Sequence, residues 1–196
     1  MIHTFIEQTL QPGPAITLTC VSIGHPLPTI LWFLDGRPLT PGHQGHYGSN
    51  RVSVGSWQNS AGQMISQVNI SSVNSEDGGL YACTAENMIG KVFHQARLNI
   101  FGPPKERPLR NMTAILGREI VLPCPMSGYP ITTTSWTLHS RPLSSTSRRS
   151  TRKDGALLIS SVDINQDVGR YTCTCSNSHG RVATASFYLI VISELY

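Results

Sequence analysis

The sequence predicts an all-β protein made of two tandem β-sandwich domains, and two observations carry this prediction. The first is an internal repeat. The pattern Cys-x11-Trp starts at Cys20 and again at Cys124, and the pattern Asp-x-Gly-x-Tyr-x-Cys ends at Cys83 and again at Cys173. The second is an alternation of apolar and polar residues with a period of two, which is typical of half-buried strands. A chain of 196 residues is long enough for two such units, each with its own core.

The first predicted domain covers residues 1–101, and its strands can be placed in chain order. Residues 16–20 read Ile-Thr-Leu-Thr-Cys, so every second side chain is expected to face the core. The strand that carries Trp32 follows, then residues 68–73, then the strand that ends in Cys83. A last strand over 96–100 closes the domain.

The second predicted domain covers residues 102–196 and repeats this order. Residues 120–124 and 157–162 correspond to 16–20 and 68–73 of the first domain. The connection Phe-Gly-Pro-Pro at 101–104 contains two prolines, so a restricted hinge is expected between the domains.

These repeated motifs resemble the immunoglobulin superfamily, and most of all its intermediate (I) set. The resemblance implies a disulfide between Cys20 and Cys83 and another between Cys124 and Cys173, each packed against a Trp and crossing between two sheets. It also implies that the Tyr two residues before the second Cys bonds back to the corner before its strand. In the chain-entropy model each bridge is worth on the order of 4 kcal/mol.

The cysteines and two sequons predict an extracellular location. Disulfides persist in oxidising compartments, and Asn69-Ile-Ser and Asn111-Met-Thr are acceptor sequences for N-glycans. Cys175 is the odd cysteine. It lies two residues after Cys173 and is expected on the same inner face, either as a buried thiol where the first domain has Ala85, or as part of an intermolecular or rearranged disulfide.

The sequence favours no enzyme, cofactor or metal site. It contains no Gly-rich phosphate loop, no HExxH or G-x-S-x-G motif and no Cys/His spacing typical of zinc. The net charge of +4 is too small and scattered to predict nucleic-acid binding. No apolar run approaches the ~18 residues of a membrane span, so the membrane attachment of a receptor is expected outside this fragment.

Charged residues suggest two local roles. Asp77 and Asp167 are expected to bind an arginine from the strand opposite, with Arg51 and Arg152 as candidates. The basic cluster Arg148-Arg149-Ser-Thr-Arg152-Lys153 is expected to be a solvated loop, with acidic glycans as the alternative partner.

Several short sequence segments narrow the resemblance to the Down syndrome cell adhesion molecule (Dscam) family. The segments that carry it are Glu76-Asp-Gly-Gly-Leu-Tyr-Ala-Cys83, the linker Phe101-Gly-Pro-Pro and Cys124-Pro-Met-Ser-Gly-Tyr-Pro130. They are most similar to the seventh and eighth immunoglobulin domains of that family. The position of Met1 so close to this pair also fits the shortened Dscam proteins of arthropods, whose ectodomain starts there.

The family resemblance implies a cell-surface receptor that binds its own copy, antiparallel, through the first domain. The sheet that contains the strands at 16–20 and 65–70 would carry the contact. Alternation along these strands predicts the outward residues, with the phase of the segment 51–54 left open; the candidates are Thr17, Thr19, Arg51, Val52, Val54, Ile65 and Gln67.

A constraint on this contact and two alternative functions stay open. A glycan on Asn69 would border the same sheet, which either limits the contact to the far end or excludes it. The first domain is also longer by 14 residues between its cysteines, within Arg37 to Met64. This region or the loops could instead bind a different partner, as in a heterophilic or immune-recognition receptor, or the pair could act only as a spacer.

Overall fold

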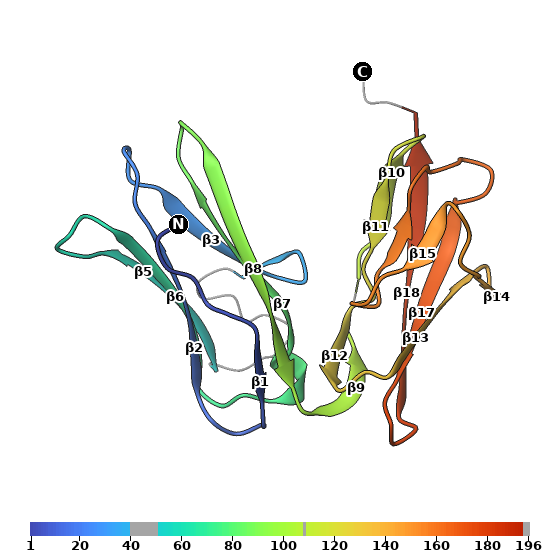
Figure 1. Ribbon diagram of the computed structural model, residues 1–196, viewed down its shortest axis with the longest axis horizontal. Helices are drawn as coiled ribbons and strands as arrows, with labels where there is room; N and C mark the ends of the chain where they lie inside the picture. Colours follow the sequence, from blue (N-terminus) through green and yellow to red (C-terminus); the bar gives the residue numbers. More distant parts are fainter. Residues whose placement is uncertain (40–50, 108, 194–196) are drawn as a thin grey trace. The chain divides into compact units, whose positions relative to one another are not determined.

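The computed structural model describes residues 1–39, 51–107 and 109–193 and confirms the all-β class (Figure 1). The chain divides into two compact units, Met1–Gly102 and Pro103–Tyr196, so the division falls one residue later than the sequence suggested. Within the described ranges the helical content is limited to one 3-10 turn, η1 (Ser75–Asp77).

The first unit is a sandwich of two sheets. One has the order β1-β8-β7-β3-β4 and the other the order β2-β6-β5. β1 runs parallel to β8, and the other neighbours are antiparallel. The bounds are β1, Gln8–Leu10; β2, Ile16–Ser22; β3, Thr29–Leu34; β4, Arg37–Leu39; β5, Val52–Gln58; β6, Met64–Ile70; β7, Gly79–Glu86; and β8, Lys91–Ile100.

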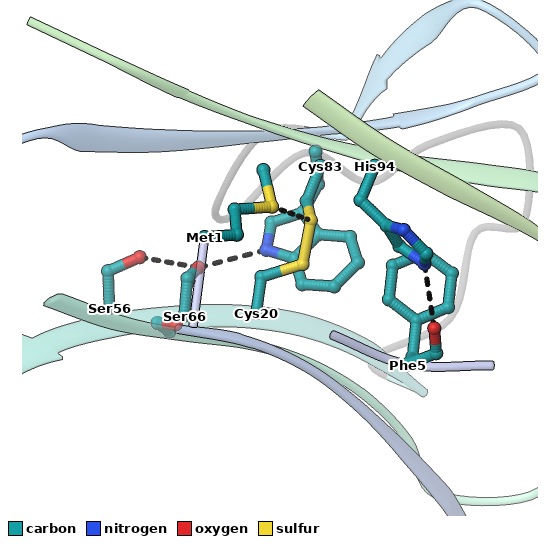
Figure 2. Close-up of a disulfide and its surroundings, with 9 residues drawn as sticks. Met1, Phe5, Cys20, Ser56, Ser66, Cys83 and His94 are labelled. Atoms are coloured by element: carbon teal, nitrogen blue, oxygen red, sulfur yellow. Dashed lines mark hydrogen bonds between the residues drawn. A yellow bond between two sulfur atoms is a disulfide. The ribbon is translucent and has the colours of Figure 1, made fainter. Parts of the chain in front are cut away.

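The core of the first unit forms around the bridge between Cys20 on β2 and Cys83 on β7, whose Cα atoms are 6.7 Å apart. Trp32 from β3 is 1% exposed, and its indole N–H donates to Ser66 Oγ on β6 at 2.9 Å. Figure 2 shows this region, with Ser56 donating to Ser66 at 2.7 Å and Met1 Sδ 3.7 Å from Cys83 Sγ. The predicted strand at 16–20 therefore has the predicted phase, with Leu18 and Cys20 buried.

The second unit has two sheets that correspond to those of the first unit and an additional two-stranded sheet. Their orders are β10-β18-β17-β13-β14, β11-β16-β15 and β12-β9. β10 runs parallel to β18, as β1 does to β8. The bounds are β9, Gly102–Glu106; β10, Met112–Ile115; β11, Ile120–Leu122; β12, Met126–Tyr129; β13, Thr133–Leu138; β14, Arg141–Pro142; β15, Arg149–Thr151; β16, Leu157–Ile159; β17, Gly169–Ser176; and β18, Val182–Ile192.

The bridge of the second unit joins Cys124 and Cys173, with Cα atoms 5.8 Å apart. Trp136 is buried beside it and donates its indole N–H to the Gly155 carbonyl at 3.0 Å. One predicted strand differs from the structure. Residues 120–124 form no single strand, because β11 ends at Leu122 and the prolines at 123 and 125 lack the N–H that a ladder needs.

Candidate functional site

The corner before β7 joins the two sheets of the first unit through a buried carboxylate. Tyr81 donates its hydroxyl to the Asp77 carbonyl at 2.8 Å, as the sequence predicted. The Asp77 carboxylate is 3.0 Å from the Arg51 guanidinium and accepts from the Asn74 N–H at 2.8 Å. Arg51 also donates to the Ser72 carbonyl, so this side chain is held at the corner.

The corresponding corner of the second unit corrects one prediction. Asp167 binds Arg148 at 2.9 Å and Arg149 at 2.5 Å, whereas Arg152 reaches Asp154 at 3.4 Å and was the wrong candidate. Burial alone would raise the pKa of Asp167, but the hydrogen bonds from the two arginines and from the Asp163 N–H, together with the charge of Arg149, outweigh it and hold this pKa below its ordinary value.

These contacts also reduce the charge available to an acidic glycan. Three of the four cations in the predicted basic cluster, namely Arg148, Arg149 and Arg152, face carboxylates of their own domain.

The outward face of the β2–β6–β5 sheet consists of three rows that run across the strands. The registers align Thr17 with Asn69 and Ser53, Thr19 with Gln67 and Gly55, and Val21 with Ile65 and Trp57. We call these the Asn69 row, the Gln67 row and the Ile65 row.

Within each of the first two rows, one hydrogen bond links the residue of β2 to its partner on β6. Thr17 donates to Asn69 Oδ1 at 2.7 Å, and Gln67 donates to Thr19 Oγ1 at 3.1 Å. The Ile65 row is apolar, and Trp57 in it is 44% exposed. One sheet face therefore has a polar end and an apolar end.

Three predicted members of this face lie elsewhere. Val52 and Val54 align with the buried Ile70 and Val68, and both pack against the core. Arg51 is engaged at the corner with Asp77. The outward positions of β5 are instead Ser53, Gly55 and Trp57, which the sequence interpretation missed. The pairing of Ser56 with Ser66 beneath Trp32 fixes this phase, and alternation within a single strand could not supply it.

The predicted glycan acceptors lie at defined places on the surface. Asn69 lies four residues from Ile65 along β6, which is about 13 Å at roughly 3.3 Å per residue. A glycan there would therefore occupy the polar end of the face. Asn111 is exposed beside β18, and its Oδ1 accepts the Tyr188 N–H at 3.0 Å.

The opposite sheet of the first unit carries an exposed row with apolar ends. The ladder aligns Leu31, Thr84 and Phe93 across β3, β7 and β8. Leu31 is 51% exposed and Phe93 69%, while Thr84 between them is 6% exposed. The turn after β7 adds Met88 and Ile89, which are also exposed.

The same row in the second unit is polar, since it consists of Ser135, Thr174 and Thr184. The fold thus accepts hydroxyl side chains at these positions, and this row is apolar at its two ends only in the first domain.

Cys175 lies in the interior of the second unit. Its side chain is 2% exposed, and its Sγ is 3.3 Å from Cys124 Sγ and 3.4 Å from Thr134 Oγ1. It thus faces inward from β17 together with Cys173, as alternation predicted. Burial raises the pKa of this thiol, and the hydrogen bond with Thr134 lowers it by less.

Neither a metal-binding cluster nor a membrane-spanning helix is present in the part of the chain that the structure describes. No group of three or more His, Cys, Asp or Glu side chains in it could hold a metal ion. No helix among these residues has the length and apolarity to cross a bilayer. Part of the long region between Arg37 and Met64, which the sequence offered as an alternative binding surface, falls at residues 40–50 and lies outside the described residues.

Comparison with known proteins points to adhesion receptors. The model of the immunoglobulin I-set domain matches residues 1–100 and 103–191. The chain is 45% identical to cell adhesion molecule Dscam2 of Drosophila melanogaster over 98% of its length, and 40% identical to cell adhesion molecule DSCAM of Homo sapiens over 88%.

A solved structure agrees with these relatives. The crystal structure of the N-terminal eight immunoglobulin domains of Dscam isoform 1.30.30 covers 97% of the chain with a TM-score of 0.86 at 34% identity. The chain spans 24% of that structure, 9% of the fly relative and 8% of the human one.

Proposed function

Because the chain belongs to the immunoglobulin I-set family and is homologous to the immunoglobulin domains of Dscam proteins, we propose that it is an extracellular fragment of a cell-surface adhesion receptor without catalytic activity. The two disulfides support this location, since such bridges persist in oxidising compartments. The membrane attachment of the receptor would lie in parts of the protein outside this fragment.

We further propose that the fragment binds a second copy of itself, antiparallel, through the Ile65 row of the first domain. The observation that carries this is the apolar end of an otherwise polar sheet face. Apolar and aromatic side chains at the centre of a contact supply most of its free energy, and polar neighbours exclude water from it.

A two-fold axis at the Ile65 row also accommodates the predicted glycan. An antiparallel contact centred on the Gln67 row would bring Asn69 of one copy against Ile65 of the other. Moving the axis to Ile65 places Ile65 against its own mate and leaves both Asn69 side chains at the periphery. The contact is then compatible with a glycan at Asn69.

Sedimentation equilibrium of the fragment over micromolar concentrations tests this proposal. We expect a reversible dimer for the wild type, and at least about 30-fold weaker association for Ile65→Asp and for Trp57→Asp, as for a residue worth about 2 kcal/mol. Leu31→Asp is the matched control, because it places the same charge on the other sheet of the same domain.

Circular dichroism must show that each variant is folded. Folded Ile65→Asp and Trp57→Asp proteins that dimerise as tightly as the wild type would overturn the choice of face. A dimer lost only in Leu31→Asp would move the contact to the β3–β7–β8 face.

A second candidate function is recognition of a different extracellular protein, and the apolar row Leu31–Thr84–Phe93 favours it. In this case the fragment is a monomer at all concentrations. Cell aggregation separates the two candidate functions. For this second function, cells that display the receptor would bind only cells that display the partner. Phe93→Asp would abolish that binding.

A further inference from the structure

Three sulfur atoms lie together in the second unit. Cys175 Sγ is 3.3 Å from Cys124 Sγ, which is itself bonded to Cys173. Cys173 and Cys175 are two residues apart on β17 and project from the same face of that strand. A free thiol therefore touches one sulfur of an existing disulfide.

The backbone around Cys124 differs from that around its counterpart Cys20. Cys20 lies in the middle of β2 and is aligned with Ser66 of β6. Cys124 lies between β11 and β12, and a proline stands on each side of it. The Met126 N–H binds its carbonyl at 2.9 Å, but Cys124 belongs to neither strand. Its side chain is consequently less restrained by a ladder than that of Cys20.

From this geometry we propose that Cys124, Cys173 and Cys175 form a thiol–disulfide exchange site, in which Cys124 pairs with either cysteine of β17. The Cys175 thiolate attacks Cys124 Sγ, so the Cys124–Cys175 bond forms and the Cys124–Cys173 bond breaks. Cys173 leaves as a thiolate and takes up the proton that Cys175 lost. Each isomer contains one disulfide and one thiol, so the step needs no oxidant or reductant.

The first domain has no third cysteine near its disulfide. The position two residues after Cys83 is Ala85, which is buried and carries no nucleophile. The Cys20–Cys83 pairing is therefore fixed. The exchange is a property of the second domain alone, and it does not depend on self-association.

Disulfide mapping of the wild-type fragment tests the proposal. The protein is incubated for days at about pH 8.5 and acidified, because exchange requires a thiolate. It is then unfolded and alkylated with N-ethylmaleimide in acid. Cleavage after Arg170 and Arg181 gives one peptide that contains both Cys173 and Cys175, and fragmentation at Thr174 locates the label.

We expect label on both cysteines, with Cys173 carrying at least roughly a tenth of it, which corresponds to a tenfold preference for the Cys124–Cys173 isomer. Label on Cys175 alone after prolonged incubation would overturn the proposal.

Single variants provide a second measurement. Cys173→Ala should contain a Cys124–Cys175 bridge and no alkylatable thiol, while the control Cys175→Ala should contain the Cys124–Cys173 bridge and likewise no free thiol. Two alkylatable thiols in a folded Cys173→Ala protein would also overturn the proposal. If the Cys173→Ala variant does not fold, the distribution of label in the wild-type protein alone tests the proposal.

Discussion

At the scale of single residues, the two domains satisfy the same buried tryptophan in different ways. Trp32 donates to a side-chain hydroxyl, Ser66 Oγ, whereas Trp136 donates to the backbone carbonyl of Gly155. A backbone acceptor survives most substitutions, but a side-chain acceptor is lost with one. The core of the first domain is therefore more sensitive to mutation at this point.

We predict that Ser66→Ala destabilises the first domain by about 1–3 kcal/mol, because it leaves the buried Trp32 N–H without its acceptor. Ser56→Ala is the control. Ser56 only donates to Ser66, which would still accept from Trp32 and donate to Gly55, so its effect should stay within about 0.5 kcal/mol. Urea unfolding followed by tryptophan fluorescence measures both, and equal losses would contradict this account.

At the scale of strands, β5 decides which residues the β2–β6–β5 face can present. Its alignment with β6 places Val52 and Val54 toward the core and Ser53 and Trp57 toward solvent. A shift of one residue would exchange the two sets, so the register is strongly specified by burial.

We predict opposite outcomes for two neighbouring substitutions in β5. Val54→Asp places a carboxylate against the core and should lower the free energy of unfolding of the first domain by about 3 kcal/mol. Ser53→Asp on the outward face should change it by less than about 0.5 kcal/mol. Thermal unfolding by circular dichroism distinguishes them, and a stable Val54→Asp protein would refute the assigned phase.

The phase of β5 is a feature that the sequence alone could not predict, in contrast to the overall fold. The repeated motifs predicted both sandwiches, and their resemblance to the immunoglobulin superfamily implied both disulfide pairings and the tyrosine corners. The phase of β5 and the choice among Arg148, Arg149 and Arg152 depend on partners distant in sequence. Several basic residues within one short segment could each reach Asp167 on chain length alone, and only the strand pairing selects among them.

At the scale of the whole molecule, the chain consists of two units with separate cores. One cluster of buried residues surrounds Cys20–Cys83, and the other surrounds Cys173 and includes Cys175. Destabilisation of one core is therefore expected to leave the other intact, and the charged corner of the second unit provides a way to observe this.

Asp167 makes the stability of the second unit depend on pH. Because its pKa is lowered on folding, the ionised carboxylate stabilises the folded state above the unfolded pKa of about 3.9, and this stabilisation is lost as the pH falls through the folded pKa. We predict that Asp167→Asn lowers the Tm of the second unit at neutral pH and weakens its dependence on pH below about 4.

Differential scanning calorimetry measures both units in one experiment. The transition of the first unit should not move in Asp167→Asn, and Ser66→Ala provides the reciprocal control. A common shift of both transitions would show that the units do not unfold separately.

The parallel pairing of β1 with β8, and of β10 with β18, has a consequence for the response of the chain to tension. In each unit a strand near the start of the chain is bonded alongside the strand that ends it. Pulling on the two ends therefore slides these strands along each other and loads their hydrogen bonds together, rather than opening them one at a time. Each domain can in this way bear a pulling force along the chain while its core stays closed.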